Sequence, residues 1–95
     1  MSDFEQKIFD AVSQAFQEVY DLEPAPDVLT VEVPRDPKLG DYATGAAMKL
    51  AKTLHKSPMD IAAPIVDKLR ELLPEAESIT VAKPGFINFK LKSGA

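Results

Sequence analysis

Pro84 and Gly85 are followed by a run in which apolar and polar side chains alternate as far as Leu91. Proline presets φ and glycine accepts a positive φ, so this pair is typical of the centre of a type II turn. Ile87, Phe89 and Leu91 would then share one face of a strand. They form an ordinary core face, and the run therefore predicts a strand with one buried side.

The opposite face of this predicted strand carries Phe86, Asn88 and Lys90, beside a turn that contains Lys83. An aromatic ring can stack on a base, an amide can hydrogen-bond a base edge, and a lysine can hold a phosphate. The alternation therefore predicts a contact with single-stranded RNA. Two alternatives stay open: Phe86 could be buried beneath a helix, and Asn88 could satisfy backbone groups of the turn.

Length and composition predict one globular domain over residues 1–95, because 45% of the residues are hydrophobic and 27% are charged. No apolar run approaches the ~18 residues of a membrane span, and the charged N-terminus is unlike a signal peptide. The absence of cysteine excludes disulfides, thiolate zinc sites and a cysteine nucleophile. We expect a cytoplasmic protein that makes no membrane contact.

The net charge of −4 is unevenly distributed along the chain. Residues 1–27 hold seven acidic residues and one basic residue, whereas residues 35–56 hold five basic residues and two acidic ones. Residues 83–95 hold three lysines and no acid. The average charge argues against nucleic acid, but the basic segments include the predicted strand, and an RNA contact fits there. The acidic first segment should face away from RNA.

The first predicted helix spans residues 3–20, where apolar residues recur at helical spacing after a capping-box pattern of Ser2 and Glu5. A second helix should run from Asp41 to Leu54, because Asp41 can cap the free amides of its first turn and Gly40 lets the backbone bend before it.

A third predicted helix starts at Ser57 and Pro58, a capping residue followed by proline at the first helical position. Pro64 should kink this helix or delay its regular start, and Pro74 should end it. Strands are expected over residues 28–33 and 78–82, in addition to the alternating run. The elements then follow the order helix, strand, helix, helix, strand, strand.

Sites for catalysis by this chain alone are missing from the sequence. His55 is the single histidine and lies beside Lys56 at a helix end, where we expect it to be exposed to solvent. No cluster of His, Asp and Glu has the spacing of metal ligands. Residues 40–45 match neither of the glycine-rich motifs that cradle phosphates. We therefore expect no catalytic residue and no metal site.

An ordered series of motifs resembles the N-terminal domain that precedes the catalytic core of arginyl-tRNA synthetases. The family shows a Gly-Asp-(Phe/Tyr)-(Ala/Ser) motif, an Ala-Met-x-Leu-Ala-Lys-like segment, a Pro-started helix with Ile-Ala and Ile-Val pairs, and a Pro-Gly-(Phe/Tyr)-(Ile/Leu)-Asn-Phe strand. Here these motifs are residues 40–43, 47–52, 58–66 and 84–89. The resemblance covers about residues 30–91, and residues 1–20 agree in pattern.

The resemblance implies an α+β domain in which about three helices pack on a small, mainly antiparallel sheet. It also implies contact with the elbow of arginine tRNA, where an exposed D-loop base is read. By position, Phe86 would stack on that base and Asn88 would hydrogen-bond its edge. On electrostatic grounds we add phosphate contacts by four basic residues, Lys83, Lys90, Arg35 and Lys38. Five residues are interpreted as structural: Gly40, Asp41, Tyr42, Pro84 and Gly85.

The resemblance further implies a longer parent enzyme that joins arginine to its tRNA with ATP and Mg²⁺. The chain lacks that enzyme's catalytic signatures, so we expect an N-terminal piece that uses no cofactor itself and contributes affinity and specificity. Its expected partners are arginine tRNA and the catalytic domain of the same chain, and DNA is not expected. An alternative is a module that docks on a protein or on the parent enzyme and makes no RNA contact.

Overall fold

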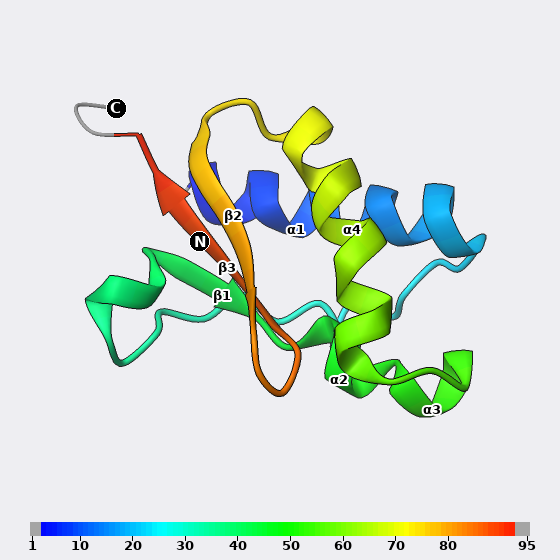
Figure 1. The fold of residues 1–95 in the computed structure, drawn as a ribbon. Helices are drawn as coiled ribbons and strands as arrows, with labels where there is room; N and C mark the ends of the chain where they lie inside the picture. Colours follow the sequence, from blue (N-terminus) through cyan, green and yellow to red (C-terminus); the bar gives the residue numbers. More distant parts are fainter. Residues whose placement is uncertain (1–2, 93–95) are drawn as a thin grey trace.

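A computed structural model describes residues 3–92. The helices are α1 (Asp3–Tyr20), α2 (Ala46–Lys49), α3 (Ala51–Leu54) and α4 (Pro58–Leu72), with a short 3-10 helix η1 (Pro37–Leu39). The strands are β1 (Tyr42–Thr44), β2 (Ala76–Ala82) and β3 (Phe86–Leu91) (Figure 1). The predicted α+β class and the predicted order of elements are both confirmed, although one predicted helix is divided into α2 and α3.

The sheet has the strand order β1-β3-β2, and both pairings are antiparallel. The alternating run is therefore the central strand. Asn88 pairs with Ala43 on one side and with Thr80 on the other, while Phe89 pairs with Tyr42 and Ile79. Because residues directly opposite one another share a face, the register fixes which side chains of the three strands lie together.

One face of the sheet supplies the core. Ile87 and Phe89 are fully buried, and α4 packs on β2 and β3 from this side. The apolar stripe of α1 then packs on α4, so α1 and α4 form the second layer, and Figure 1 shows them crossing beside the sheet. Truncating an aromatic side chain such as Phe89 to alanine in a core costs about 3–5 kcal/mol. The predicted core face of the strand is confirmed.

Aromatic residues at the two ends of α1 connect it to the other elements. The rings of Phe4 and Tyr42 stack with their centroids 5.9 Å apart, so Tyr42 faces α1. The Tyr20 hydroxyl donates a hydrogen bond to the Ile61 carbonyl at 3.0 Å, and burial raises the pKa of Tyr20. The predicted helix over residues 3–20 is confirmed, while Ser2 of the capping box lies outside the described residues.

The start of α4 follows the sequence prediction. The Ser57 hydroxyl accepts a hydrogen bond from the Asp60 amide at 3.2 Å, and Pro58 occupies the first helical position. Pro64 lies inside the helix, which begins on time at Pro58 and continues to Leu72. The expected delay of its regular start was wrong, because the cap and Pro58 already fix the first turn.

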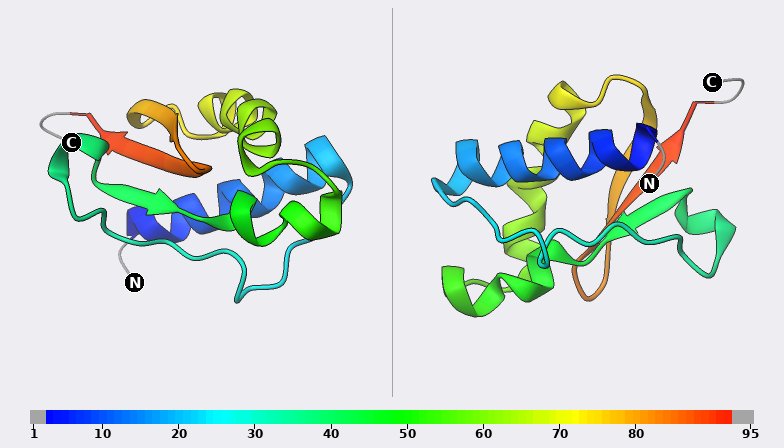
Figure 2. Two further views of the ribbon diagram at one scale, coloured as in Figure 1. Left: turned by 60° about the horizontal axis from the view of Figure 1, so that its bottom comes forward. Right: turned by 180° about the vertical axis from the view of Figure 1, so that it is seen from behind.

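The strand predicted over residues 28–33 was wrong. The segment begins with a turn, in which the amides of Val28 and Leu29 donate to the carbonyls of Ala25 and Pro26. Of this segment, only Glu32 forms a bridge with the sheet. Prolines on both sides of the segment limit its backbone, and β-branched composition did not overcome that limit. Figure 2 shows residues 21–36 running as a linker from α1 to η1.

The helix start predicted at Asp41 was also wrong. The Asp41 amide donates to the Phe89 carbonyl at 2.8 Å, and its carboxylate accepts from the Leu91 amide at 2.8 Å. The next three residues form β1, and the helix begins only at Ala46. The carboxylate does satisfy a backbone amide, as a cap would, but that amide lies fifty residues away in the sequence. A tertiary contact has replaced the local one.

The turn between β2 and β3 differs from the predicted type II turn at Pro84 and Gly85. Its hydrogen bond joins the Gly85 amide to the Ala82 carbonyl at 2.9 Å, so Pro84 is its third residue, and the Lys83–Pro84 peptide bond is cis. Gly85 has φ +153°, and a Cβ there would lie 2.4 Å from Cβ of Pro58. The tip of the hairpin therefore sits directly against the start of α4.

We expect Asp41→Ala to lower the free energy of unfolding by about 1 kcal/mol, because it removes the acceptor of the Leu91 amide from a partly exposed site. Urea denaturation measures the change. Asp27→Ala is the control, since Asp27 is an exposed residue of the linker, and it should shift stability by less than about 0.5 kcal/mol. Equal effects of the two substitutions would contradict the assigned role of Asp41.

We expect Gly85→Ala to cost about 1–3 kcal/mol, because the new methyl group would meet Pro58 and the residue would hold a positive φ. Gly45→Ala is the matched control. Its Cβ would lie 3.1 Å from the flexible end of Met48, and its φ of −100° suits any residue, so a loss below about 1 kcal/mol is expected. Thermal or urea unfolding of both variants gives the comparison, and an equally stable Gly85→Ala protein would refute the close contact.

Candidate nucleic-acid interface

A cavity of about 450 Å³ opens on the face of the sheet that lies opposite the helices. Its sheet side is formed by Ala43 of β1, Asn88 and Phe86 of β3, and Ala82 of β2. Residues 32–35 and Leu39 line it from the loop before β1, and Lys83 lines it from the hairpin. The volume falls within the range of about 300–1,000 Å³ that small-ligand sites occupy. Small side chains at Ala43 and Ala82 leave the room.

Phe86 is half-buried and lines this cavity. A Cβ at Gly45 would lie 3.7 Å from Cε1 of the ring, so the start of α2 supports the ring from behind. Phe86 is therefore held in place without being covered by a helix, and the alternative of complete burial is not what the structure shows. A ring supported in this way is suited to stacking on a base.

Asn88 is 4% exposed and lies at the centre of the cavity's sheet side, between Ala43 and Thr80. Within residues 3–92 its side-chain amide makes no hydrogen bond, so it does not satisfy the turn backbone. The amide is not sealed off either, because Thr30 Oγ1 is the fully buried side-chain polar atom without a partner in this part of the chain. Buried polar groups are normally hydrogen-bonded, and this amide can bond to a ligand in the cavity.

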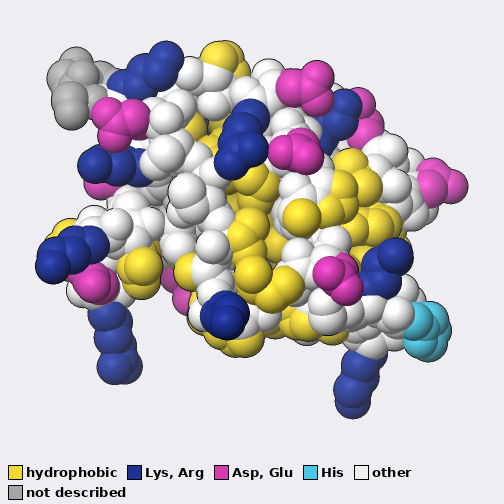
Figure 3. Space-filling view, viewed as in Figure 1, with side chains coloured by type: hydrophobic (Ala, Val, Ile, Leu, Met, Phe, Trp, Pro, Cys, Tyr) yellow, Lys and Arg dark blue, Asp and Glu magenta, His cyan; other side chains and the backbone are white. Residues whose placement is uncertain are grey.

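The basic residues predicted to meet phosphates divide into two groups. Arg35 and Lys83 line the cavity, are exposed, and form no ion pair with any described residue. Lys38 lies on η1 outside the cavity, and Lys90 lies further along β3, where its ammonium is 3.4 Å from a Glu77 carboxylate oxygen. In Figure 3, basic side chains project along the lower border of the view, near η1, the hairpin tip and α3.

Sequence reasoning missed the loop side of the cavity. Glu32, Val33 and Leu39 all line it, and Val33 and Leu39 are 74% and 46% exposed. An exposed apolar pair beside a half-buried ring offers flat contact surface to a planar ligand. No local pattern marks these residues, because their position depends on the pairing of Glu32 with Ala43. His55, by contrast, is exposed at the end of α3, as expected.

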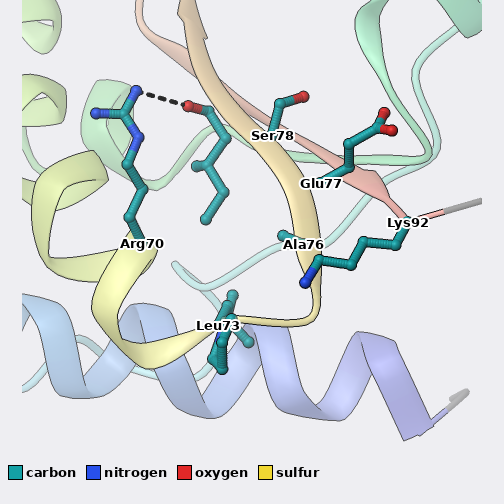
Figure 4. Close-up of a pocket in the computed structure, with 8 residues that line it drawn as sticks. Arg70, Leu73, Ala76, Glu77, Ser78 and Lys92 are labelled. Atoms are coloured by element: carbon teal, nitrogen blue, oxygen red, sulfur yellow. Dashed lines mark hydrogen bonds between the residues drawn. The ribbon is translucent and has the colours of Figure 1, made fainter.

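Two smaller hollows contain none of the predicted contact residues. One, of about 190 Å³, lies between the end of α4 and β2, where Arg70 donates to the Ile79 carbonyl at 3.1 Å (Figure 4). The other, of about 270 Å³, lies between α1 and the end of α4. There, hydrogen bonds from the Glu75 backbone and from Lys7, whose ammonium is 3.0 Å away, lower the pKa of Glu75. Both hollows are bordered by mixed charges and few apolar groups.

Two further searches covered the described residues. Among residues 3–92, no group of three or more His, Cys, Asp or Glu side chains is arranged to hold a metal ion. None of the helices in this range combines the length and the apolar composition that crossing a membrane requires.

Comparison with known proteins links these features to one family. The profile described as arginyl tRNA synthetase N terminal domain matches residues 4–91. Over 93 residues, or 96% of this chain, the sequence is 40% identical to the arginine–tRNA ligase of Listeria monocytogenes. It is 45% identical over 82 residues, 86% of this chain, to the arginine–tRNA ligase of Thermotoga petrophila. The enzyme of the same name from Staphylococcus carnosus is 48% identical over 71 residues, 75% of this chain.

The matched region is a small part of each relative. It covers 16% of the Listeria protein, 14% of the Thermotoga protein and 13% of the Staphylococcus protein. The profile match extends from the second residue of α1 to the last residue of β3, so it includes every helix and strand described above. The chain belongs to the arginyl-tRNA synthetase N-terminal domain family.

Proposed function

We propose that this domain binds arginine tRNA at its elbow and holds an exposed D-loop base in the cavity beside Phe86 and Asn88. Family membership supports tRNA as the partner. The observation that carries the proposal is the Asn88 amide, which is almost fully buried, reaches a cavity, and has no hydrogen bond within residues 3–92. Sequence-specific RNA recognition works in this way, by taking an unstacked base into a pocket.

Phe86 and Asn88 would divide the work between affinity and discrimination. Stacking of a base on an aromatic ring is worth about 1–3 kcal/mol and tolerates any base, because every base has a π-face. The amide has two donors and an acceptor and can pair with the edge of a base. Phe86 therefore supplies binding, and Asn88 contributes to the choice of base. Their spacing of two residues on one strand points both into the same cavity.

Arg35 and Lys83 would meet the phosphates on either side of the bound base. Both line the cavity and have no acidic partner among the described residues. Lys38 and Lys90 lie outside it and would reach phosphates farther along the strand. Because a site of this size makes few phosphate contacts, the isolated domain should bind weakly and with a strong dependence on salt.

In the longer enzyme, a separate catalytic domain would join arginine to the tRNA in the cytoplasm. ATP and Mg²⁺ would act there, since residues 3–92 show no cluster of metal ligands. The domain described here would help to select the tRNA and would carry out no chemistry. Gly40, Asp41, Tyr42, Pro84 and Gly85 would act through the fold, because their contacts fix β1 and the hairpin against the rest of the domain.

An amide-resolved NMR titration of the domain with arginine tRNA at low salt tests the site. We expect chemical shift changes centred on residues 82–88 and 32–35, which shrink when the D-loop base is changed. The outer face of α1 is the internal control and should show no change, because its acidic residues repel RNA. No change with either tRNA, together with changes caused by the catalytic domain, would instead indicate a protein-docking module.

Asn88→Ala and Lys83→Ala should weaken binding in different ways. Asn88→Ala removes a base-edge contact, so it should reduce the preference for the natural D-loop base by about tenfold with a smaller loss of affinity for other sequences. Lys83→Ala removes a phosphate contact, so it should weaken every tRNA alike and reduce the salt slope by about 1. Fluorescence anisotropy at several salt concentrations measures both effects. Lys7→Ala on α1 is the control, and identical behaviour of the two cavity variants would contradict the roles assigned.

A further inference from the structure

Glu32 is the acidic side chain among the described residues that line the cavity. Its amide donates to the Ala43 carbonyl at 2.8 Å, and the Ala43 amide donates to the Glu32 carbonyl at 2.7 Å. Glu32 is thus directly opposite Ala43, which is in turn directly opposite Asn88. Opposed residues of antiparallel strands point to the same face, so Glu32, Ala43 and Asn88 form one row across the cavity.

The row places two polar side chains at a distance that suits one base. Neighbouring strands are about 4.8 Å apart, which puts the backbones of Glu32 and Asn88 about 10 Å apart. Between them stands only the methyl group of Ala43. Val33 and Leu39 on the loop side and Phe86 on the sheet side add apolar surface. Apolar walls with two polar groups at the bottom suit a planar heterocycle better than a phosphate.

The two polar groups differ in what they can discriminate. The Asn88 amide carries both a donor group and an acceptor, and rotation by half a turn exchanges them, so it can pair with an amino group or with a keto oxygen. A carboxylate accepts hydrogen bonds and cannot donate one. It pairs with the exocyclic amino group of adenine or cytosine and is repelled by the keto oxygen that uracil has at the equivalent place.

We infer that Glu32 is a specificity-determining residue, which selects adenine or cytosine over uracil in this cavity. The inference rests on the proposed function, because it assumes that an RNA base enters the cavity. Glu32 is exposed and forms no ion pair or side-chain hydrogen bond with any other described residue, so its carboxylate is not needed to hold the fold. Arg35 of the same loop leaves it unpaired.

The sign of the expected effect separates selection from simple repulsion. A carboxylate beside phosphates weakens the binding of any RNA, so its neutralisation should tighten binding to every sequence. If Glu32 also accepts a hydrogen bond from the base, neutralisation should help the uracil form far more than the adenine form. The ratio of the two affinities therefore reports selection, whereas the mean affinity reports charge.

The experiment measures dissociation constants of the 95-residue chain for arginine tRNA with adenine, cytosine or uracil at the D-loop position, at one fixed salt concentration. We expect the unmodified protein to prefer adenine or cytosine over uracil by about tenfold, the value of one good base contact. Glu32→Gln should reduce this ratio severalfold, mainly through tighter binding of the uracil form. Glu23→Gln is the matched control, because Glu23 is exposed on the linker and does not line the cavity.

Two results would overturn the inference, and they are distinguishable. If Glu32→Gln tightens binding of all three tRNAs by the same factor, as a general charge effect would, Glu32 does not select and the proposed function still holds. If Phe86→Ala leaves tRNA binding unchanged, no base enters the cavity, and the proposed function fails together with the role of Glu32. Phe86→Ala is measured beside Glu32→Gln, and circular dichroism confirms that both variants are folded.

Discussion

The two hydrogen bonds between Asp41 and β3 fix the geometry on which the rest of the exposed sheet face depends. The amide and the carboxylate of one residue engage Phe89 and Leu91, on either side of Lys90. This double contact sets the register of β1, a strand of only three residues that could not define its own pairing. A shift by one residue would turn Ala43 toward the helices and put Tyr42 or Thr44 beside Asn88.

The same register extends to the loop before β1. Because Ala43 is placed opposite Asn88, its outer edge is free to pair with Glu32, and this single bridge brings the loop to the side of the cavity. Gly40 makes the approach possible, since a Cβ there would lie 2.7 Å from the Phe89 carbonyl oxygen. The cavity is thus assembled from segments far apart in the sequence by backbone hydrogen bonds, and its side chains need not hold it together.

The elements that could be predicted from the sequence are those whose signals are local. The apolar stripe of α1, the Ser57–Pro58 start of α4 and the alternation of β3 each arise within one segment, and the contact candidates Phe86 and Asn88 followed from that alternation. The motif around Asp41 misled because a capping carboxylate and a cross-strand carboxylate look identical in sequence. Glu32 and Val33 could not be found, since their place depends on a pairing between residues 32 and 43 that no periodicity encodes.

The hydrogen bond from Arg70 to the Ile79 carbonyl has a consequence for the behaviour of the domain in a crowded cell. β2 is the outer strand of the sheet on that side, and outer strands expose backbone groups on which a second chain can assemble. Arg70 occupies one of those carbonyls from α4, and the register shift between Ala76 and Ser78 disturbs the regular spacing of the others. A guanidinium and an irregular strand thereby protect the domain from edge-to-edge aggregation.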